Sequence, residues 1–311
     1  MNEDTEKNSG IVKAGFAAIL GKPNSGKSTL MNLLLGQKIS ITTNKPQTTR
    51  KRILGILSEE NYQIIFLDTP GILKPGYLLQ EKMMDHVSQS VKDADVVILL
   101  IDIAADPDGS NTLQDEFVSE FLQRNKKPVL LLLNKIDLSD ETKIKNVFNK
   151  FDQQGLFKRI IPISASMGFN TQQIVPAIVE LLPSHPKYYP DDIVADENER
   201  FFVSEIIREK ILEQYQEEIP YSVEIAIADF KEQEDRKDFI QAEIFVERDS
   251  QKGIIIGRQG SAIKKLGENA RKAIEDFLQR PVFLELRVKV KSKWRSDEKM
   301  LRNFGYSSGE E

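Results

Sequence analysis

Short apolar runs alternate with amphipathic stretches from residue 14 to about residue 182. Each run is followed by polar sequence with helical periodicity, except that a polar SEEN joins two runs and predicts a hairpin. We expect strands at 14–20, 53–58, 62–68, 96–102, 128–134 and 159–164. Continuous apolar strands with helices between them are typical of a mostly parallel sheet that helices cover on both faces. This part of the chain therefore predicts an α/β domain.

The pattern changes at residues 183–198, where prolines and acidic residues cluster and predict an interdomain linker. Beyond the linker, the spacing predicts helices at about 200–215 and 259–279 and strands at 221–228, 240–247 and 282–290. This order indicates a second, smaller α+β domain. The expected organisation is a flexible N-terminus at 1–12, a first domain at 13–182, the linker, a second domain at 199–306 and a tail at 307–311.

Composition excludes several classes of function. The 311 residues include no cysteine and 2 histidines, which excludes a disulfide framework, a thiolate nucleophile, an iron–sulfur cluster and a Cys- or His-type metal site. No apolar run approaches the ~20 residues that span a bilayer. The N-terminal MNEDTEKNSG is acidic and polar, the reverse of a signal peptide. We therefore expect a cytoplasmic protein.

The net charge of −5 conceals an uneven distribution. Residues 250–306 contain 14 Lys and Arg against 6 Asp and Glu, a local charge of +8, whereas the first 249 residues have a charge of −11. A basic C-terminal quarter favours a polyanionic partner at that end of the chain. A solvated surface of mixed charge is the alternative on charge alone.

GKPNSGKS at 21–28 fits the P-loop pattern G-x-x-x-x-G-K-[ST] and lies between a predicted strand and a predicted helix. The glycines allow backbone amides to turn toward a phosphate chain, and the helix N-terminus adds partial positive charge. Lys27 can reach the β- and γ-phosphates, and Ser28 can bind Mg²⁺. We expect the nucleotide phosphates to contact Gly21, Lys22, Pro23, Asn24, Ser25, Gly26, Lys27, Ser28 and Thr29.

DTPG at 68–71 follows a neighbouring strand, and an acid at that position holds Mg²⁺ in P-loop enzymes. We expect Asp68 to hold the metal and the Gly71 amide to sense a γ-phosphate. Taken alone, DTPG could be an ordinary turn. The nucleotide-binding residues expected here are Asp68, Thr69, Pro70, Gly71 and Ile72.

NKID at 134–137 and SAS at 164–166 also follow strands, at the edge where α/β sheets bind ligands. Asp137 can accept two hydrogen bonds from guanine, whereas adenine has no such donor pair, so the site predicts GTP. Asn134 can tie the base loop to the P-loop, the Lys135 stem can cover the base, and the Ala165 amide can donate to guanine O6. The base-site residues expected are Asn134, Lys135, Ile136, Asp137, Ser164, Ala165 and Ser166.

These four motifs in this order resemble a small Ras-like GTPase of the translation-factor class. PQTTRKRILGI at 46–56 is similar to the first switch of the Era family, in which Thr48 or Thr49 would close onto Mg²⁺ and the γ-phosphate. We favour Thr49. The resemblance implies Lys27, Thr49 and Gly71 as catalytic residues and Ser28, Thr49 and Asp68 as metal ligands. ILKPGYLLQEKMM at 72–84 reads as a second switch.

Two positions bear on how fast GTP is hydrolysed. Ile72 stands where Ras-like enzymes carry the glutamine that orients water, so hydrolysis must rely on another group or be slow. Asn24 matches an asparagine that coordinates a monovalent cation in related GTPases, and the resemblance therefore implies K⁺ beside the phosphates. The alternative for Asn24 is a residue that only forms the turn.

GIIIGRQG at 253–260 precedes the last predicted helix, and this order of elements resembles a type II KH domain. The GxxG glycines would let a nucleic-acid backbone approach, three isoleucines would form an apolar floor, and the last strand would present a basic stripe followed by Trp294 as a stacking aromatic. A tight corner without a ligand is the alternative for GxxG. The RNA-binding residues expected are Ile254, Ile255, Ile256, Gly257, Arg258, Gln259, Gly260, Lys264, Arg287, Lys289, Lys291 and Lys293.

The resemblance to the Era family extends over nearly the whole chain. It implies a monomeric protein that hydrolyses GTP to GDP with Mg²⁺ and binds small-subunit (16S-type) rRNA near its 3′ end, in the assembly and maturation of the 30S-type subunit. It also implies weak peripheral association with the cytoplasmic face of the cell membrane. Two alternatives stay open, namely a nearly idle GTPase that acts mainly as an RNA-binding assembly factor and a membrane-associated signalling GTPase.

Overall fold

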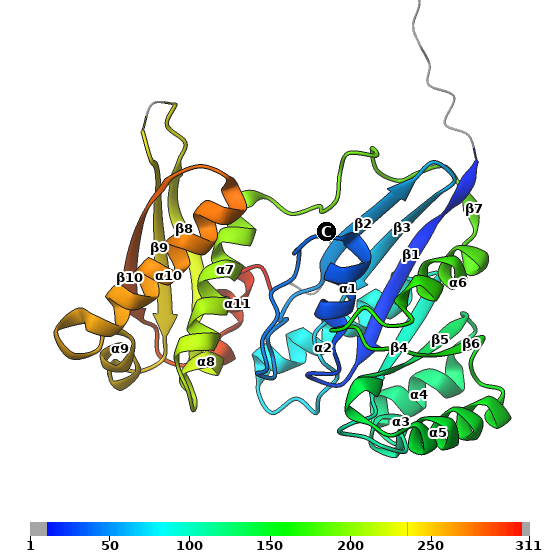
Figure 1. Cartoon of the computed structure of the whole chain (residues 1–311). Helices are drawn as coiled ribbons and strands as arrows, with labels where there is room; N and C mark the ends of the chain where they lie inside the picture. The colour runs from blue at the N-terminus through cyan, green and yellow to red at the C-terminus, as the bar shows by residue number, and fades with distance from the viewer. Residues whose placement is uncertain (1–10, 235, 307–311) are drawn as a thin grey trace, which may run out of the picture. The chain divides into compact units, whose positions relative to one another are not determined.

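A computed structural model describes residues 11–234 and 236–306 (Figure 1). The chain forms two compact units, and neither is continuous in sequence. The first unit comprises residues 1–40, 52–73 and 86–196, and the second comprises residues 41–51, 74–85 and 197–311. Residues 1–10 and 307–311, which were expected to be a flexible N-terminus and a tail, lie outside the described part of the chain.

The first unit is built on a mostly parallel sheet with the strand order β2-β3-β1-β4-β5-β6. Only the pairing of β2 with β3 is antiparallel within this order, which confirms the predicted hairpin. Every residue of β5 and nearly every residue of β4 is buried, so both faces of the central strands are covered, as predicted. The strands are β1 Val12–Gly21, β2 Ile53–Glu59, β3 Tyr62–Asp68, β4 Val96–Asp102, β5 Val129–Asn134 and β6 Arg159–Pro162.

Helices follow most of these strands and supply the cover. Asp115 caps the N-terminus of α4 through the Phe117 amide, and Asp140 caps α5 through the Lys143 amide. Gly155, with a φ of 62°, ends α5 in the left-handed conformation that glycine adopts without strain. The helices are α1 Lys27–Leu35, α2 Leu78–Asp93, α3 Ser110–Leu113, α4 Glu116–Arg124, α5 Glu141–Gln154 and α6 Ile174–Leu181.

Residues 183–195, within the segment expected to be a linker, are attached to the first unit. The short strand β7 (Ser184–His185) pairs antiparallel with the start of β1. The buried Gln63 side chain accepts hydrogen bonds from the Tyr188 and Tyr189 amides at 2.7 and 3.0 Å and donates to the Tyr189 carbonyl. Farther along, the Ile56 amide donates to the Val194 carbonyl at 2.7 Å. Residues 183–195 are therefore bonded to β1, Gln63 of β3 and Ile56 of β2.

The C-terminal part of the second unit is a three-stranded sheet, ordered β10-β9-β8, with α7 and α10 packed on one face (Figure 1). Apolar side chains at alternate strand positions, such as Ile240, Ala242 and Ile244, form the core with these helices. The elements are α7 Glu199–Gln214, α8 Ile219–Ser222, β8 Glu224–Lys231, β9 Asp238–Val246, α9 Asp249–Ile256, α10 Ser261–Leu278, β10 Val282–Val290 and α11 Glu298–Asn303. No helix in the described residues is long and apolar enough to span a membrane.

Candidate functional site

The P-loop connects β1 to α1 at the carboxyl edge of the first unit's sheet. Gly21 and Gly26 have φ angles of 156° and 100°, and a Cβ at Gly26 would lie 2.4 Å from the Asn134 side chain, so both positions need glycine. The Lys27 ammonium is buried in the loop and donates to the carbonyls of Gly21 and Lys22 at 3.1 and 3.0 Å. Burial lowers the pKa of Lys27 from 10.5 to about 8, although Asp68 opposes this shift.

Ser28 and Asp68 lie together beside Lys27. The Ser28 hydroxyl donates to Asp68 Oδ2 at 2.7 Å, and the whole carboxylate is buried. Burial raises the pKa of Asp68, and hydrogen bonds from hydroxyl groups oppose the shift. Asp68 Oδ1 is also buried and has no hydrogen-bond partner among the described residues. A hydroxyl, a carboxylate and an unsatisfied oxygen are donors suited to Mg²⁺, so these residues fit the metal.

The DTPG turn packs directly against the P-loop. The Thr69 hydroxyl donates to the Ile19 carbonyl at 2.6 Å, and the Ile72 amide donates to the Gly21 carbonyl at 3.0 Å. A Cβ at Gly71 would lie 2.6 Å from the Pro23 nitrogen, so only glycine allows this approach. The Ile72 side chain is buried and has no polar atom that could orient water. The turn thus places the Gly71 backbone beside the phosphate loop.

Asn134 connects the base motifs to the P-loop, as predicted. Its Nδ2 donates to the Ser25 carbonyl at 2.7 Å, and its Oδ1 accepts a hydrogen bond from the Ala165 amide at 3.0 Å. The Ala165 amide therefore has an acceptor within the protein, and its predicted contact with guanine O6 stays a prediction. The amide holds the SAS turn against the NKID motif.

Lys135 and Asp137 have the exposure that base recognition requires. Lys135 has a left-handed φ of 65°, and its ammonium forms a 2.6 Å ion pair with Asp102. Asp137 is exposed and has no hydrogen bond or ion pair with another described residue, so its carboxylate is available to accept from guanine. The remaining predicted contacts Ile136, Ser164 and Ser166 lie in the same two turns, and Lys22 at the phosphate end pairs with Asp115 at 3.3 Å.

Segment 41–51, which contains the predicted first switch threonines, is part of the second unit. The Thr42 amide donates to Glu209 Oε1 on α7 at 3.1 Å. The Lys45 ammonium donates to the carbonyls of Leu212 and Tyr215 at the C-terminus of α7. A cation at this end of a helix satisfies free carbonyls and is favoured by the helix dipole. The segment is therefore docked on α7.

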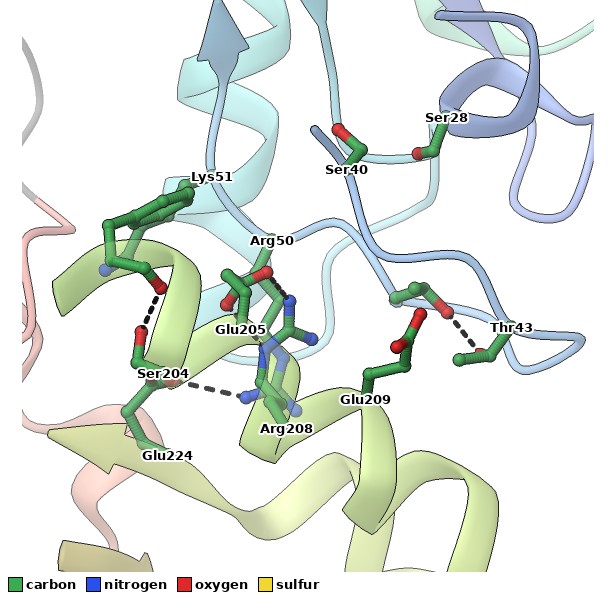
Figure 2. Close-up of polar contacts among 12 residues, drawn as sticks. Ser28, Ser40, Thr43, Arg50, Lys51, Ser204, Glu205, Arg208, Glu209 and Glu224 are labelled. Carbon is green, nitrogen blue, oxygen red and sulfur yellow. Dashed lines mark hydrogen bonds and ion pairs between the residues drawn. The ribbon is translucent and has the colours of Figure 1, made fainter. Parts of the chain in front are cut away.

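Arg50 is the most deeply buried anchor of segment 41–51. Its guanidinium donates to the carbonyls of Val223 and Pro220 at 2.6 and 3.0 Å and pairs with Glu224 at 3.2 Å. Tyr306 donates its hydroxyl to the same Glu224 carboxylate at 2.8 Å. Figure 2 shows Arg50 and Glu224 within this polar cluster.

The two candidate switch threonines differ in their surroundings. The Thr48 hydroxyl is 2.7 Å from the Thr43 hydroxyl and donates to the Lys45 carbonyl, which closes a turn within segment 41–51. Thr49 is buried in the second unit. The role of Thr49 as a metal ligand stays a prediction.

The GxxG turn connects α9 to α10 in the second unit. Gly257 and Gly260 have left-handed φ angles of 71° and 78°, and a Cβ at Gly257 would lie 2.5 Å from the Ala262 Cβ. Arg258, Gln259 and Lys264 are all exposed on or just after the turn. Neither Arg258 nor Lys264 has an ion pair or side-chain hydrogen bond to another described residue, so both cations are available to phosphate.

Two predicted contacts are buried and must be corrected. Ile254 is 49% exposed, but Ile255 belongs to the core, because adjacent residues of α9 point in different directions. Trp294, expected to stack on a base, is also fully buried, and its indole N–H donates to the Ser222 carbonyl at 3.0 Å. The apolar floor is therefore limited to Ile254 and the partly exposed Ile256.

The basic stripe of β10 is partly neutralised. Arg287 pairs with Glu285 at 2.6 Å, and Lys289 pairs with Glu243 on β9 at 2.5 Å. Lys291 and Lys293 follow the strand and are exposed. The sequence pattern predicted the alternation but not the acidic partners, because the pairing of Lys289 with Glu243 depends on the register between β10 and β9.

Ser40 and the anchors Lys45 and Arg50 were not predicted as functional. Ser40 donates its hydroxyl to Asp68 Oδ2 at 2.9 Å, so it belongs to the candidate metal site. No spacing rule connects a serine at this position with DTPG. The partners of Arg50 lie 170 or more residues away along the chain, and no local pattern reveals them.

Comparisons with known proteins identify both domains of the chain. A family model described as 50S ribosome-binding GTPase matches residues 16–135, and a model described as KH domain matches residues 218–295. The chain is 42% identical to GTPase Era of Clostridium beijerinckii over 298 residues, which cover 96% of this chain and 99% of the relative. It is 47% identical over 298 residues to GTPase ERA1, chloroplastic, of Zea mays, with coverages of 94% and 70%.

Two solved structures resemble the chain over nearly its full length. The crystal structure of a single-residue variant of Aquifex aeolicus Era bound to GDP·AlF4⁻ gives a TM-score of 0.88 at 37% identity, covering 95% of this chain and 100% of that one. The crystal structure of Era in complex with MgGDPNP and nucleotides 1506–1542 of 16S ribosomal RNA gives a TM-score of 0.88 at 38% identity, with coverages of 95% and 99%.

Proposed function

The chain belongs to the Era family of GTPases, and we propose that it couples GTP hydrolysis to the binding of small-subunit rRNA near its 3′ end during subunit assembly. GTP hydrolysis follows from family membership, because the relatives are GTPases and one was crystallised with GDP·AlF4⁻. The observation that supports the proposal most directly is the Ser28–Asp68 pair beside the buried Lys27. This arrangement can hold a nucleotide together with its metal.

The nucleotide unit provides positions and charges rather than a covalent nucleophile. Lys27, released from the two loop carbonyls, pairs with the β- and γ-phosphates, while loop amides surround the phosphate chain. Ser28 and Asp68 would hold Mg²⁺, which neutralises charge on the phosphates when it is bound. Asp137 accepts from the guanine edge, and Asn134 keeps the base turn and the phosphate loop in register.

The buried Ile72 leaves the orientation of the attacking water to another group. We propose that a K⁺ ion held near Asn24 supplies part of the catalysis that a water-orienting glutamine would otherwise provide. The Asn24 side chain is exposed in the P-loop. Its left-handed φ of 63° also agrees with the alternative of a turn-forming residue, since asparagine tolerates this conformation. Replacing K⁺ by Na⁺ should slow turnover of the wild type but not of Asn24→Ala. Equal wild-type turnover in K⁺ and in Na⁺ would reject a role for K⁺ in hydrolysis.

The RNA proposal rests on the free cations of the GxxG turn and on the RNA-bound relative. The description of the matched GTPase family model names the 50S particle. The Era structure that aligns over 95% of this chain instead contains 16S rRNA. We follow the second, since it includes the KH domain as well as the GTPase. The partner is then a single-stranded segment near the 3′ end of the small-subunit rRNA, within a 30S-type particle.

Coupling between nucleotide and RNA is proposed to run through segment 41–51. Its first residues follow Ser40 of the nucleotide unit directly, while Thr42, Lys45 and Arg50 are bonded within the RNA-binding unit. Binding of GTP and Mg²⁺ at Thr49 would act on the segment that carries these bonds, and the population of KH conformations would shift. RNA affinity measured with GTP-analogue-loaded and GDP-loaded protein should therefore differ. Equal affinities would reject the coupling but leave hydrolysis intact.

The proposal is tested by GTP turnover and by RNA crosslinking on the same preparation. Wild-type protein should hydrolyse GTP, Lys27→Ala should not, and a crosslink map of a 3′-terminal 16S fragment should include Arg258. Absence of crosslinks to residues 254–264 would reject the RNA site. The docked segment and Ile72 favour a second candidate, a GTPase that is nearly idle until it meets its particle. Single-turnover hydrolysis with and without small subunits separates the two.

The oligomeric state and the cellular location of the protein follow from the family resemblance. We propose a monomer in the cytoplasm with weak peripheral attachment to the membrane through the exposed lysines after β10. Sedimentation with anionic liposomes tests the attachment, and a protein that stays wholly in the supernatant at low salt would reject it.

A further inference from the structure

Asp68 receives a second hydroxyl that nucleotide motifs do not include. Ser40 Oγ donates to Asp68 Oδ2 at 2.9 Å, and Ser28 Oγ donates to the same oxygen at 2.7 Å. Figure 2 shows the side chains of Ser28 and Ser40 next to each other. The Ser40 side chain is 1% exposed, so water does not compete for this hydrogen bond.

The position of Ser40 is itself fixed by α1. Asn32 Oδ1 accepts hydrogen bonds from the amides of Ile39 and Ser40, both at 2.9 Å. Asn32 Nδ2 donates to the Ser40 carbonyl at 2.7 Å. Because one side chain satisfies both backbone groups of Ser40, its hydroxyl is directed at Asp68 before any ligand arrives.

The two hydroxyls make the oxygens of the Asp68 carboxylate unequal, because both donate to the same oxygen. Oδ2 accepts from Ser28 and Ser40, whereas Oδ1 is buried without a hydrogen-bond partner in the described part of the chain. A carboxylate held by one hydroxyl can turn about its Cβ–Cγ bond, while a second donor from a different direction restrains that rotation.

We propose that Ser40 is a positioning residue for Mg²⁺, which holds Asp68 so that Oδ1 is presented to the metal or to its water ligand. The inference rests on the proposed metal site at Ser28 and Asp68. Ser40 itself need not touch the nucleotide or the metal. Its loss should weaken the hold on Mg²⁺ and leave the phosphate loop and the base site as they are.

The test measures the affinity of a fluorescent GDP analogue over a series of Mg²⁺ concentrations and in EDTA. For Ser40→Ala we expect the Mg²⁺ concentration at half effect to rise about tenfold, the low end for partners of metal ligands. The affinity in EDTA should stay at the wild-type value. Ser40→Thr, which keeps the hydroxyl, should restore most of the Mg²⁺ response.

Ser90→Ala is the matched control. Ser90 is also a buried serine of the first unit, but its hydroxyl donates to the His86 carbonyl within α2. Its substitution should leave the Mg²⁺ series unchanged. If Ser40→Ala does not fold, Asn32→Ala provides a second route, because it releases the Ser40 backbone and should shift the series in the same direction.

The outcomes separate this inference from the proposed function. A wild-type Mg²⁺ series for Ser40→Ala, combined with loss of the response in Ser28→Ala, would overturn the role of Ser40 alone. A fall in EDTA affinity equal to the fall in Mg²⁺ would show a general effect on the loop and would also overturn it. A wild-type protein whose GDP affinity ignores Mg²⁺ would remove the metal site, and the proposed function with it.

Discussion

Arg50 and Glu224 form an ion pair with 3.2 Å between Nη1 and Oε2, and their side chains are only 1% and 6% exposed. Two backbone carbonyls and the Tyr306 hydroxyl also form hydrogen bonds with the pair, whereas Arg50 Nε is buried without a hydrogen-bond partner in the described part of the chain. Removing either partner from a buried pair of this kind is strongly destabilising, because the remaining charge would be buried without a counter-charge. The pair therefore anchors segment 41–51 in the second unit.

Arg50→Ala should destabilise the second unit by ~3–5 kcal/mol, the usual cost of removing one partner from a buried pair. Trp294 is the single tryptophan of the chain and is buried in the same unit, so its fluorescence reports unfolding there. Arg52→Ala is the control, since Arg52 pairs with Asp93 at a site where the side chains are 29% and 35% exposed. That variant should change stability by less than ~1 kcal/mol. Equal denaturation midpoints for the two variants would contradict the anchor.

GDP affinity should fall as the pH rises from 7 to 9. Burial lowers the pKa of Lys27 to about 8, so the free protein loses the ammonium that the phosphates need. At one pH unit above that pKa about a tenth of the lysines are protonated, and affinity should drop roughly tenfold. Lys27→Arg remains charged and should show a flatter profile, whatever its absolute affinity. The folding stability of the ligand-free protein should change in the opposite direction. Between pH 8 and 10.5 the unfolded chain binds more protons at Lys27 than the folded chain, so the free energy of unfolding rises with pH.

Asp137→Asn should exchange the base preference from guanine to xanthine. Xanthine has a carbonyl at C2 in place of the amino group, so an amide can donate where the carboxylate accepted. GDP affinity should fall by at least ~10²-fold because a guanine N–H donor loses its carboxylate acceptor. Competition with XDP and GDP gives the measurement. Asp140→Asn, three residues along and still able to cap α5, should retain the wild-type preference.

Arg258 and Arg287 should differ in their contribution to RNA binding. Arg258 has no acidic partner among the described residues, whereas Arg287 is paired with Glu285 at 2.6 Å. Arg258→Ala should weaken binding of a single-stranded RNA and reduce the slope of log K against log salt by about 0.7, the value for one phosphate contact on a single strand. Arg287→Ala should change the slope little. The opposite result would move the RNA surface from the GxxG turn to β10.

Local patterns predicted much of the fold. The strands at 96–102 and 282–290 begin and end where apolar runs and alternation placed them. The link from Asn134 to the P-loop was also predicted, because both motifs follow strands whose carboxyl ends share an edge. In each case the information lies within a few residues or in the order of the strands.

What could not be predicted depends on pairs far apart in the chain. Lys45 meets the end of α7 and Arg50 meets Glu224 across more than 160 residues, so no window of sequence contains both partners. Trp294 shows a second limit. An aromatic residue after a basic strand suits either a stacking surface or a core, and only its packing against Phe304 and its bond to Ser222 decide between them.

The division of the chain into interleaved units affects how the protein can be dissected. A fragment that ends at residue 196 keeps the P-loop and all its base motifs, but segments 41–51 and 74–85 lose every partner between residues 197 and 306. The complementary fragment keeps Glu224 and Tyr306 but loses the Arg50 guanidinium that pairs with Glu224. Rates measured on a liberated GTPase fragment would thus describe an unrestrained first switch, and comparison with the intact chain would measure what the restraint does.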